Sequence, residues 1–183
     1  LAAPDGDGSW RLRVVIVPGA TYGSAKCWPR ERYAALADRL AETYNAAVLL
    51  CGTSGEASLG EAIAGRMKTR PRLLFGATTL EEFFAVLSEA DLFIGNDSGA
   101  MHLAAGLGLP EVVIFGPTDL AGTGPLNPRA RIVTHPVSCS PCFLRHCPVD
   151  HRCMPRVRVE DVWREVEAAV VDVDAGPALG VEE

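Results

Sequence analysis

The strongest constraint on the fold of this chain is a regular alternation between short apolar segments and amphipathic helical segments. The apolar segments are three to six residues long and rich in Val, Ile and Leu, as strands are. Strand and helix alternate five times, which predicts a parallel sheet covered on both faces: an open, doubly wound, Rossmann-like α/β domain. The expected strands are residues 12–17, 46–50, 72–75, 92–94, 112–115 and 131–134.

Helix boundaries follow from capping signals. Pro29 opens the first helix, where its missing N–H costs nothing. Thr79, with Glu82 three residues later, forms a capping box that opens the third. Gly and Pro residues interrupt the stretch 120–130, which is therefore expected to be a loop. The remaining helices are expected at about residues 58–68, 101–107 and 159–171.

The chain of 183 residues is long enough for one domain with a substantial core. That domain is expected to span residues 12–171 and to carry a Cys-rich loop at 138–154. Residues 1–11 lack an initiator Met and are rich in Gly, Asp and Pro, so they are expected to be a linker cut from a longer protein. Residues 172–183 are expected to form a flexible tail.

Charge and hydropathy exclude several classes of protein. The formal net charge is −6 and no basic stripe is visible, which argues against nucleic-acid binding. No apolar run reaches the roughly 18 residues that a membrane-spanning helix needs. The first ten residues have neither the basic flank nor the apolar centre of a signal peptide. A cytoplasmic location is therefore expected.

The best candidate for a binding site is the strand–turn–helix stretch 91–102. Its turn, residues 95–99, consists of turn- and cap-forming residues, and small apolar residues follow at helical density. This arrangement aims backbone N–H groups and the positive end of a helix dipole at an anion. Asp97, Ser98 and His102 lie where the anion and its neighbours would be. The stretch therefore predicts a site for a nucleotide diphosphate.

The loop after the first strand offers further candidates. The ammonium group of Lys26 can reach a phosphate as a point charge, although a solvated surface lysine is the alternative reading. Thr21 and Tyr22 add hydroxyl groups, which the polarity of a turn would also explain. Parallel sheets of this kind bind ligands at the carboxyl ends of their strands, where these loops lie.

Three more side chains have both a binding and a structural interpretation. Asp97 can cap the helix that follows it, hold a sugar hydroxyl, or orient His102. His102, in the first helical turn, can donate a hydrogen bond to a phosphate oxygen or be structural. Glu56 can accept hydrogen bonds from a ribose or base edge, or be an ordinary exposed acid.

Four cysteines form a cluster with the spacing C-x2-C-x4-C-x5-C and with two histidines inside it. Thiolates at such spacing can close tetrahedrally around Zn²⁺, so a structural zinc site is one of three readings of the cluster, although no metal site is assigned. Free thiols or a local disulfide are the alternatives, because the spacing is not that of a familiar paired zinc knuckle. The cysteines are Cys139, Cys142, Cys147 and Cys153.

Two sequence signatures together resemble a known family. Residues 96–105 carry Asp-Ser-Gly-x-x-His, and residues 115–118 read Phe-Gly-Pro-Thr. Residues 18–20 and 26–29 add Pro-Gly-Ala and Lys-x-Trp-Pro. In combination these resemble the lipopolysaccharide heptosyltransferases of glycosyltransferase family 9, from about residue 14 to residue 171.

The resemblance implies a GT-B architecture, in which two Rossmann-like halves face each other across a cleft. This chain resembles the C-terminal half, which grips the donor ADP-heptose. The full enzyme would be inverting, would need no metal cofactor, and would transfer heptose to the lipopolysaccharide inner core, at most peripherally at the inner face of the inner membrane. Its catalytic base and acceptor site belong to the N-terminal half. No catalytic residue is therefore expected here, and this chain alone should bind donor without transferring sugar.

The resemblance also implies roles for residues of the first loop and of the turn after the fourth strand. Lys26 and Thr21 would contact the diphosphate and the adjoining sugar. Tyr22 would lie beside them, at a position where some relatives carry Thr. Asp97 would hold the heptose hydroxyls.

Five further substrate contacts are implied in the same way. Ser98, Gly99 and His102 would meet the diphosphate at the start of the helix. Glu56 and Thr78 would lie near the nucleoside. Two other functions stay open on the sequence: an interaction module stapled by metal, and a related glycosyltransferase that uses another nucleotide-sugar, such as a UDP-sugar.

Overall fold

The structure is a computed structural model that describes residues 10–174. Six strands form one sheet in which every neighbouring pair is parallel. Their order is β3-β2-β1-β4-β5-β6, so the chain starts in the middle of the sheet and builds outward in both directions. The strands are β1 (Leu12–Val17), β2 (Ala46–Gly52), β3 (Arg72–Phe75), β4 (Leu92–Asn96), β5 (Glu111–Phe115) and β6 (Ala130–Thr134).

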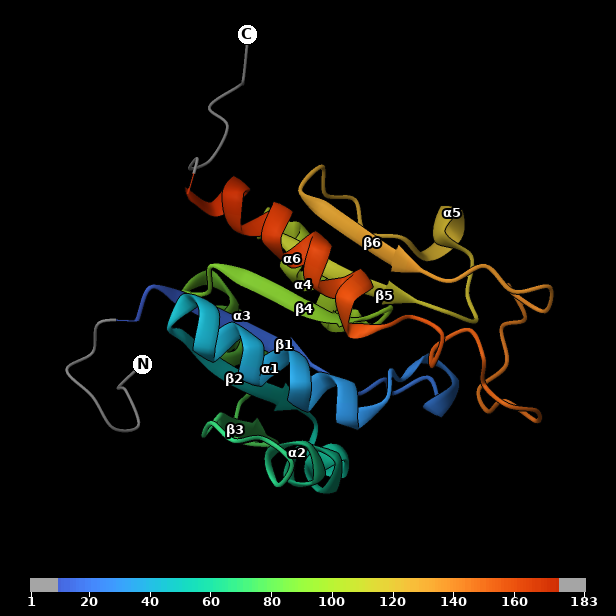
Figure 1. Cartoon of the computed structure of the whole chain (residues 1–183), viewed down its shortest axis with the longest axis horizontal. Coiled ribbons are helices and arrows are strands. Elements are labelled where there is room, and N and C mark those ends of the chain that lie inside the picture. The colour runs from blue at the N-terminus through green and yellow to red at the C-terminus, as the bar shows by residue number, and fades with distance from the viewer. Residues whose placement is uncertain (1–9, 175–183) are drawn as a thin grey trace, which may run out of the picture.

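Helices cover both faces of this sheet (Figure 1). One core cluster joins α1, α2 and α6 to the sheet, and the second joins α3 and α4 to the opposite face. The predicted doubly wound α/β fold is therefore confirmed. The helices are α1 (Arg30–Tyr44), α2 (Ala57–Ala64), α3 (Leu80–Ser88), α4 (Gly99–Gly106), α5 (Leu120–Thr123) and α6 (Val159–Asp174), with short 3₁₀ turns η1 (Ser24–Lys26) and η2 (Ser54–Glu56).

Alternating side chains explain how one sheet fills two cores. In β1, Val14 and Ile16 belong to the α1/α6 core, whereas Val15 and Val17 belong to the α3/α4 core. Successive residues of a strand point to opposite faces, so a strand covered on both sides is apolar at nearly every position. This is why the strand segments stand out in the sequence as continuous apolar runs.

The predicted capping box at the start of α3 is confirmed. The backbone N–H of Glu82 donates to the Thr79 hydroxyl at 3.2 Å, and Thr79 donates its N–H to the Glu82 carboxylate at 2.8 Å. The expectation of a plain loop over 120–130 is wrong at its start, where α5 forms. Asp119 accepts a hydrogen bond from the Ala121 N–H at 3.3 Å and so caps this single turn.

Two helix ends also differ from expectation. α2 stops at Ala64, before the predicted end at Lys68, because the Asp38 carboxylate takes up the Lys68 N–H at 2.9–3.0 Å. α6 continues to Asp174, past the predicted end, and the Asp172 carboxylate pairs with Arg131 at 2.8 Å. Most of the predicted linker (1–9) and tail (175–183) lies outside the described residues. Across residues 10–174, every helix falls short of the length and apolar character that crossing a bilayer requires.

Candidate functional site

A cleft of about 320 Å³ lies where the strand order reverses, between the segments that follow β1 and β4. Such reversal points are where open α/β sheets bind ligands, because the two following loops diverge to opposite faces. We call it the β1/β4 cleft. It is lined by Ala20, Thr21, Tyr22, Lys26, Asp97, Ser98, Gly99, His102, Gly122 and Thr123. Seven of the nine residues predicted to contact substrate are in this set.

A buried ion pair lies at the cleft. The Lys26 ammonium is 2.6 Å from the Asp97 carboxylate, and the two side chains are only 10% and 5% exposed. Two hydroxyl groups donate to the same carboxylate oxygen, Thr118 at 2.6 Å and Thr123 at 3.2 Å. Lys26 is therefore not the solvated surface lysine of the alternative reading. Its charge is compensated by a carboxylate of the protein itself.

The amino end of α4 forms the wall opposite the first loop. Ser98 is its N-cap in an extended conformation, and its buried hydroxyl has no hydrogen-bond partner among residues 10–174. The space above Gly99 is open, with nothing within 4 Å of where a Cβ would be. His102 is exposed in the first turn. Free N–H groups and an unpartnered hydroxyl at a helix start suit an anion with several oxygens.

Asn96 holds the cleft together, a role that the sequence reading missed because it treated this residue only as a turn former. Its amide group donates to the Pro18 carbonyl at 2.7 Å. Its carbonyl oxygen accepts from the Tyr33 hydroxyl at 2.9 Å and from the Trp28 N–H at 3.4 Å. Asn96 is fully buried, so these bonds tie the end of β4 to the first loop and to α1.

The Cys-rich loop supports the first loop from outside. Ala25 donates its N–H to the Arg145 carbonyl at 3.0 Å, and its own carbonyl lies 2.5 Å from the His151 Nε2. The Ser24 hydroxyl is 2.9 Å from the His146 Nδ1. These contacts fix the backbone of η1, the turn that carries Lys26.

Tyr22 links this support to the cleft. Its hydroxyl donates to the Phe143 carbonyl at 2.7 Å. The Lys26 Nζ and the Arg145 Cζ each lie 4.8 Å from the centre of its ring, within the range of cation–π attraction. The Tyr22 ring thus packs against the Lys26 ammonium at the cleft.

Two predicted residues do not line the cleft. The Glu56 carboxylate accepts hydrogen bonds from the Thr53 N–H at 2.9 Å and hydroxyl at 2.8 Å, which closes a capping box. It also lies against Gly19, where a Cβ would be 2.0 Å from its oxygen. The Thr53-x-x-Glu56 pattern is a capping signal that the sequence reading overlooked. Thr78 is half-buried ahead of α3, and its predicted contact with the nucleoside stays a prediction.

The structure does not support the zinc reading of the Cys-rich loop. The four cysteines of the loop are free thiols that border one cavity of about 220 Å³. Within residues 10–174, however, no group of three or more His, Cys, Asp or Glu side chains is arranged to hold a metal ion. Cys153 is buried in the core beside Met154, and burial raises the pKa of its thiol, whereas the other three are exposed. Cys153, one of the four cysteines of the cluster, is therefore part of the hydrophobic core.

Comparison with known proteins identifies the family. The model of glycosyltransferase family 9 (heptosyltransferase) matches residues 3–152. The chain belongs to glycosyltransferase family 9. The resemblance seen in the two signatures is therefore confirmed over most of the chain.

Relatives and solved structures within family 9 agree. The chain is 31% identical over 154 residues to a lipooligosaccharide heptosyltransferase 2 of Campylobacter jejuni, covering 82% of this chain and 49% of the relative. It is 35% identical over 130 residues to lipopolysaccharide heptosyltransferase 2 of Escherichia coli, covering 68% and 37%. The structure of E. coli ADP-heptose LPS heptosyltransferase II matches with a TM-score of 0.80 and 28% identity, over 91% of this chain and 48% of that one. The chain thus spans about half the length of the curated relatives it matches.

Proposed function

We propose that this chain is the donor-binding half of a heptosyltransferase that moves heptose from ADP-heptose to the lipopolysaccharide inner core. The observation that carries the proposal is the convergence of Lys26, Asp97, Ser98 and His102 on one cleft at the reversal of strand order. The names of the family 9 relatives supply the sugar and the acceptor. The work would be done in the cytoplasm, at most peripherally at the inner face of the inner membrane.

The diphosphate of the donor binds between the amino end of α4 and Lys26. Its oxygens accept hydrogen bonds from the free N–H groups of the first turn, from the Ser98 hydroxyl and from His102. They also draw the Lys26 ammonium away from Asp97, so that the ligand replaces an internal countercharge. This positive charge and the helix dipole then stabilise the departing ADP without a metal ion.

Once Lys26 turns to the diphosphate, Asp97 is free to accept hydrogen bonds from sugar hydroxyls. Thr118 and Thr123 keep its carboxylate in place during this exchange. The reaction itself is an in-line displacement that inverts the anomeric carbon, and its acidic base and its acceptor site lie in the other half of the GT-B enzyme. The 183-residue chain alone therefore binds donor and does not transfer sugar.

Isothermal titration of the chain with ADP tests the proposal. Because Lys26 and Lys68 are the only two lysines in the sequence, Lys68→Ala is a matched control for Lys26→Ala. We expect ADP to bind the wild type and the Lys68→Ala chain equally, and Lys26→Ala to weaken binding at least about tenfold. A folded wild-type chain that binds no ADP would overturn the proposal, and tighter binding of UDP than of ADP would reassign the donor.

A further inference from the structure

Four large apolar side chains lie exposed beside the β1/β4 cleft. Phe143, Leu144 and Val149, from the loop between β6 and α6, are 50%, 45% and 75% exposed, and Tyr22 of the first loop is 38% exposed. The Tyr22 hydroxyl donates to the Phe143 carbonyl, and Leu144, the next residue, borders the same cavity as Val149. The four residues therefore belong to one region of the surface, which we call the loop patch.

The loop patch lies at the edge of the sheet that carries the β1/β4 cleft. Figure 1 shows the orange chain of this loop extending beyond the carboxyl ends of β5 and β6. Residues 141–150 are all exposed, and Tyr22 is itself part of the cleft lining. Neighbouring large apolar side chains that face water next to a binding site are a common sign of an interaction surface. A partner on this patch would therefore also lie at the rim of the cleft.

Positive charge is concentrated in the same segment. Residues 135–158 contain four arginines and one aspartate, with no lysine or glutamate, which gives a formal charge of +3. The whole chain has a formal charge of −6, so the remainder of the chain carries −9. The segment that exposes the apolar side chains is thus opposite in charge to the rest of the protein, and a complementary partner would be anionic.

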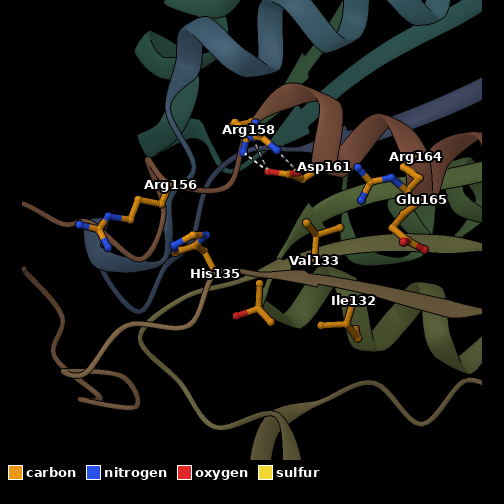
Figure 2. Close-up of a pocket in the computed structure, with 9 residues that line it drawn as sticks. Ile132, Val133, His135, Arg156, Arg158, Asp161, Arg164 and Glu165 are labelled. Carbon is orange, nitrogen blue, oxygen red and sulfur yellow. Dashed lines mark hydrogen bonds and ion pairs between the residues drawn. The ribbon is translucent and has the colours of Figure 1, made fainter.

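Two of the four arginines in this segment are free of carboxylate partners. Arg152 and Arg158 each pair with a nearby aspartate, at 2.8 and 3.0 Å. Within residues 10–174, the side chains of Arg145 and Arg156 have neither a hydrogen bond nor an ion pair. The Arg145 Cζ lies 4.8 Å from the centre of the Tyr22 ring, so this cation is part of the loop patch. Figure 2 shows the Arg156 side chain directed away from the Arg158 ion pair.

We propose that the loop patch docks on the surface of an anionic lipid bilayer. Phe143, Leu144 and Val149 enter the interfacial region, and Arg145 and Arg156 lie beside the phosphate groups of the lipids. Aromatic and aliphatic side chains combined with cations are the combination by which peripheral proteins bind such surfaces. Across residues 10–174 every helix is too short or too polar to span the bilayer, so this contact is a surface contact.

Charge also separates this partner from a second copy of the chain. Two loop patches in contact would bring two +3 segments together, and like charges across an interface oppose association. The inference rests on the proposed function for its meaning: an acceptor that is itself a lipid would reach the β1/β4 cleft from the bilayer on which the patch docks. The binding of the patch to lipid is measured independently of the binding of ADP.

Sedimentation of the 183-residue chain with lipid vesicles tests the apolar part of the patch. The vesicles contain equal parts phosphatidylcholine and phosphatidylglycerol, or phosphatidylcholine alone. We expect binding to the anionic vesicles, weakened at least about tenfold in Phe143→Asn/Val149→Ser. Asn is chosen because Phe143 has a φ of 55°, which Asn adopts readily. Leu126→Ser, at a side chain that is 96% exposed and outside the patch, is the matched control and should bind as the wild type does.

The cationic part of the patch has a control of its own. Arg145→Gln should weaken binding to the anionic vesicles about fivefold, and added salt should reduce this difference. Arg70→Gln, at an exposed arginine that precedes β3, should leave binding unchanged. All of the replaced side chains are exposed, and the unfolding temperature of each variant checks that it folds.

Several outcomes would overturn the proposal. These are a folded wild-type chain that does not bind anionic vesicles, equal binding to both kinds of vesicle, and equal losses in the patch variants and their controls. A dimer that dissociates in Phe143→Asn/Val149→Ser, without lipid binding, would assign the patch to a second copy. Calorimetry with ADP separates this inference from the proposed function. Vesicle binding without ADP binding would support the patch and overturn the donor site, and the reverse result would overturn the patch alone.

Discussion

Two neighbouring strands bury a carboxyl group at opposite ends of the sheet, in very different surroundings. Asp97, which follows the carboxyl end of β4, is paired with Lys26 and accepts from two threonine hydroxyls. Glu111, which begins β5 at the amino end, is fully buried and accepts one hydrogen bond, from Asn127 at 2.9 Å. Its other oxygen has no partner in the part of the chain that the structure describes.

The difference shows what this sheet does with a buried carboxyl group. Burial raises the pKa of Glu111 to about 7, and the Asn127 hydrogen bond only partly offsets it, so this end of the sheet holds a proton. At the other end, Lys26 supplies a countercharge. A buried ion pair is weak evidence of stability in itself, because desolvation offsets most of its attraction. A countercharge that a ligand can replace is a feature of a binding site.

The largest expected effect comes from removing the carboxylate at the carboxyl end. Asp97→Ala leaves the Lys26 ammonium buried without a countercharge, which should lower the free energy of unfolding by about 3 kcal/mol. Asp119→Ala, a change at an exposed acid that caps only α5, should cost less than about 1 kcal/mol. Urea unfolding of the two variants measures the difference. Equal losses would mean that the Lys26–Asp97 pair contributes no more to the free energy of unfolding than an exposed helix cap does.

An intermediate effect is expected at the amino end, and it depends on pH. Since the folded state holds the Glu111 proton up to about pH 7 and the unfolded state releases it near 4.5, stability should fall as pH rises between these values. The loss between pH 5 and pH 8 should be about 2 kcal/mol. Glu111→Gln should remove this slope, whereas Glu61→Gln, at an exposed position, should keep it. A slope that survives in Glu111→Gln would assign it to another group.

The smallest expected effect separates the two hydroxyls that hold Asp97. Thr118→Val removes the shorter, more buried hydrogen bond and should cost about 1 kcal/mol. Thr123→Val should cost less. Its bond to Asp97 is longer, and its single hydroxyl hydrogen is shared with the Asp119 carbonyl, 3.0 Å away. Thermal unfolding compares the two variants. If Thr123→Val proved the more costly, the order of these contacts would be reversed in solution.

Much of the fold could be predicted because its signals are local. Apolar runs mark strands covered on both sides, and the Thr79–Glu82 pair marks a helix start within four residues. The position of the cleft followed from a general property of parallel sheets, which brings the ends of β1 and β4 together. The turn of α5 was missed because the hydrogen bond from the Ala121 N–H to the Asp119 carboxylate stabilises a helical turn despite the glycines that follow.

The remainder of the site depends on contacts between residues far apart in the chain. Nothing near Asn96 in the sequence indicates that its amide reaches Pro18, 78 positions earlier. The same is true of Cys153, whose spacing suggests a metal ligand while its side chain packs in the core. Glu56 shows the opposite case, since its bond to Thr53 was visible as a local pattern and competes with the predicted ligand contact.

The hydrogen bonds that join His151 and Arg145 to Ala25 also determine when, during synthesis, the turn that carries Lys26 can reach its final structure. Ribosomes deliver a chain from its amino end, and its early parts begin to fold while the rest is still being made. The turn bearing Lys26 emerges early, yet the two groups that bond to it, the Arg145 carbonyl and the His151 imidazole, lie 120 and 126 positions downstream. A nascent chain can therefore assemble most of its sheet while its lysine turn still lacks this support. The nucleotide binding proposed for the β1/β4 cleft should consequently be among the last properties to appear during synthesis.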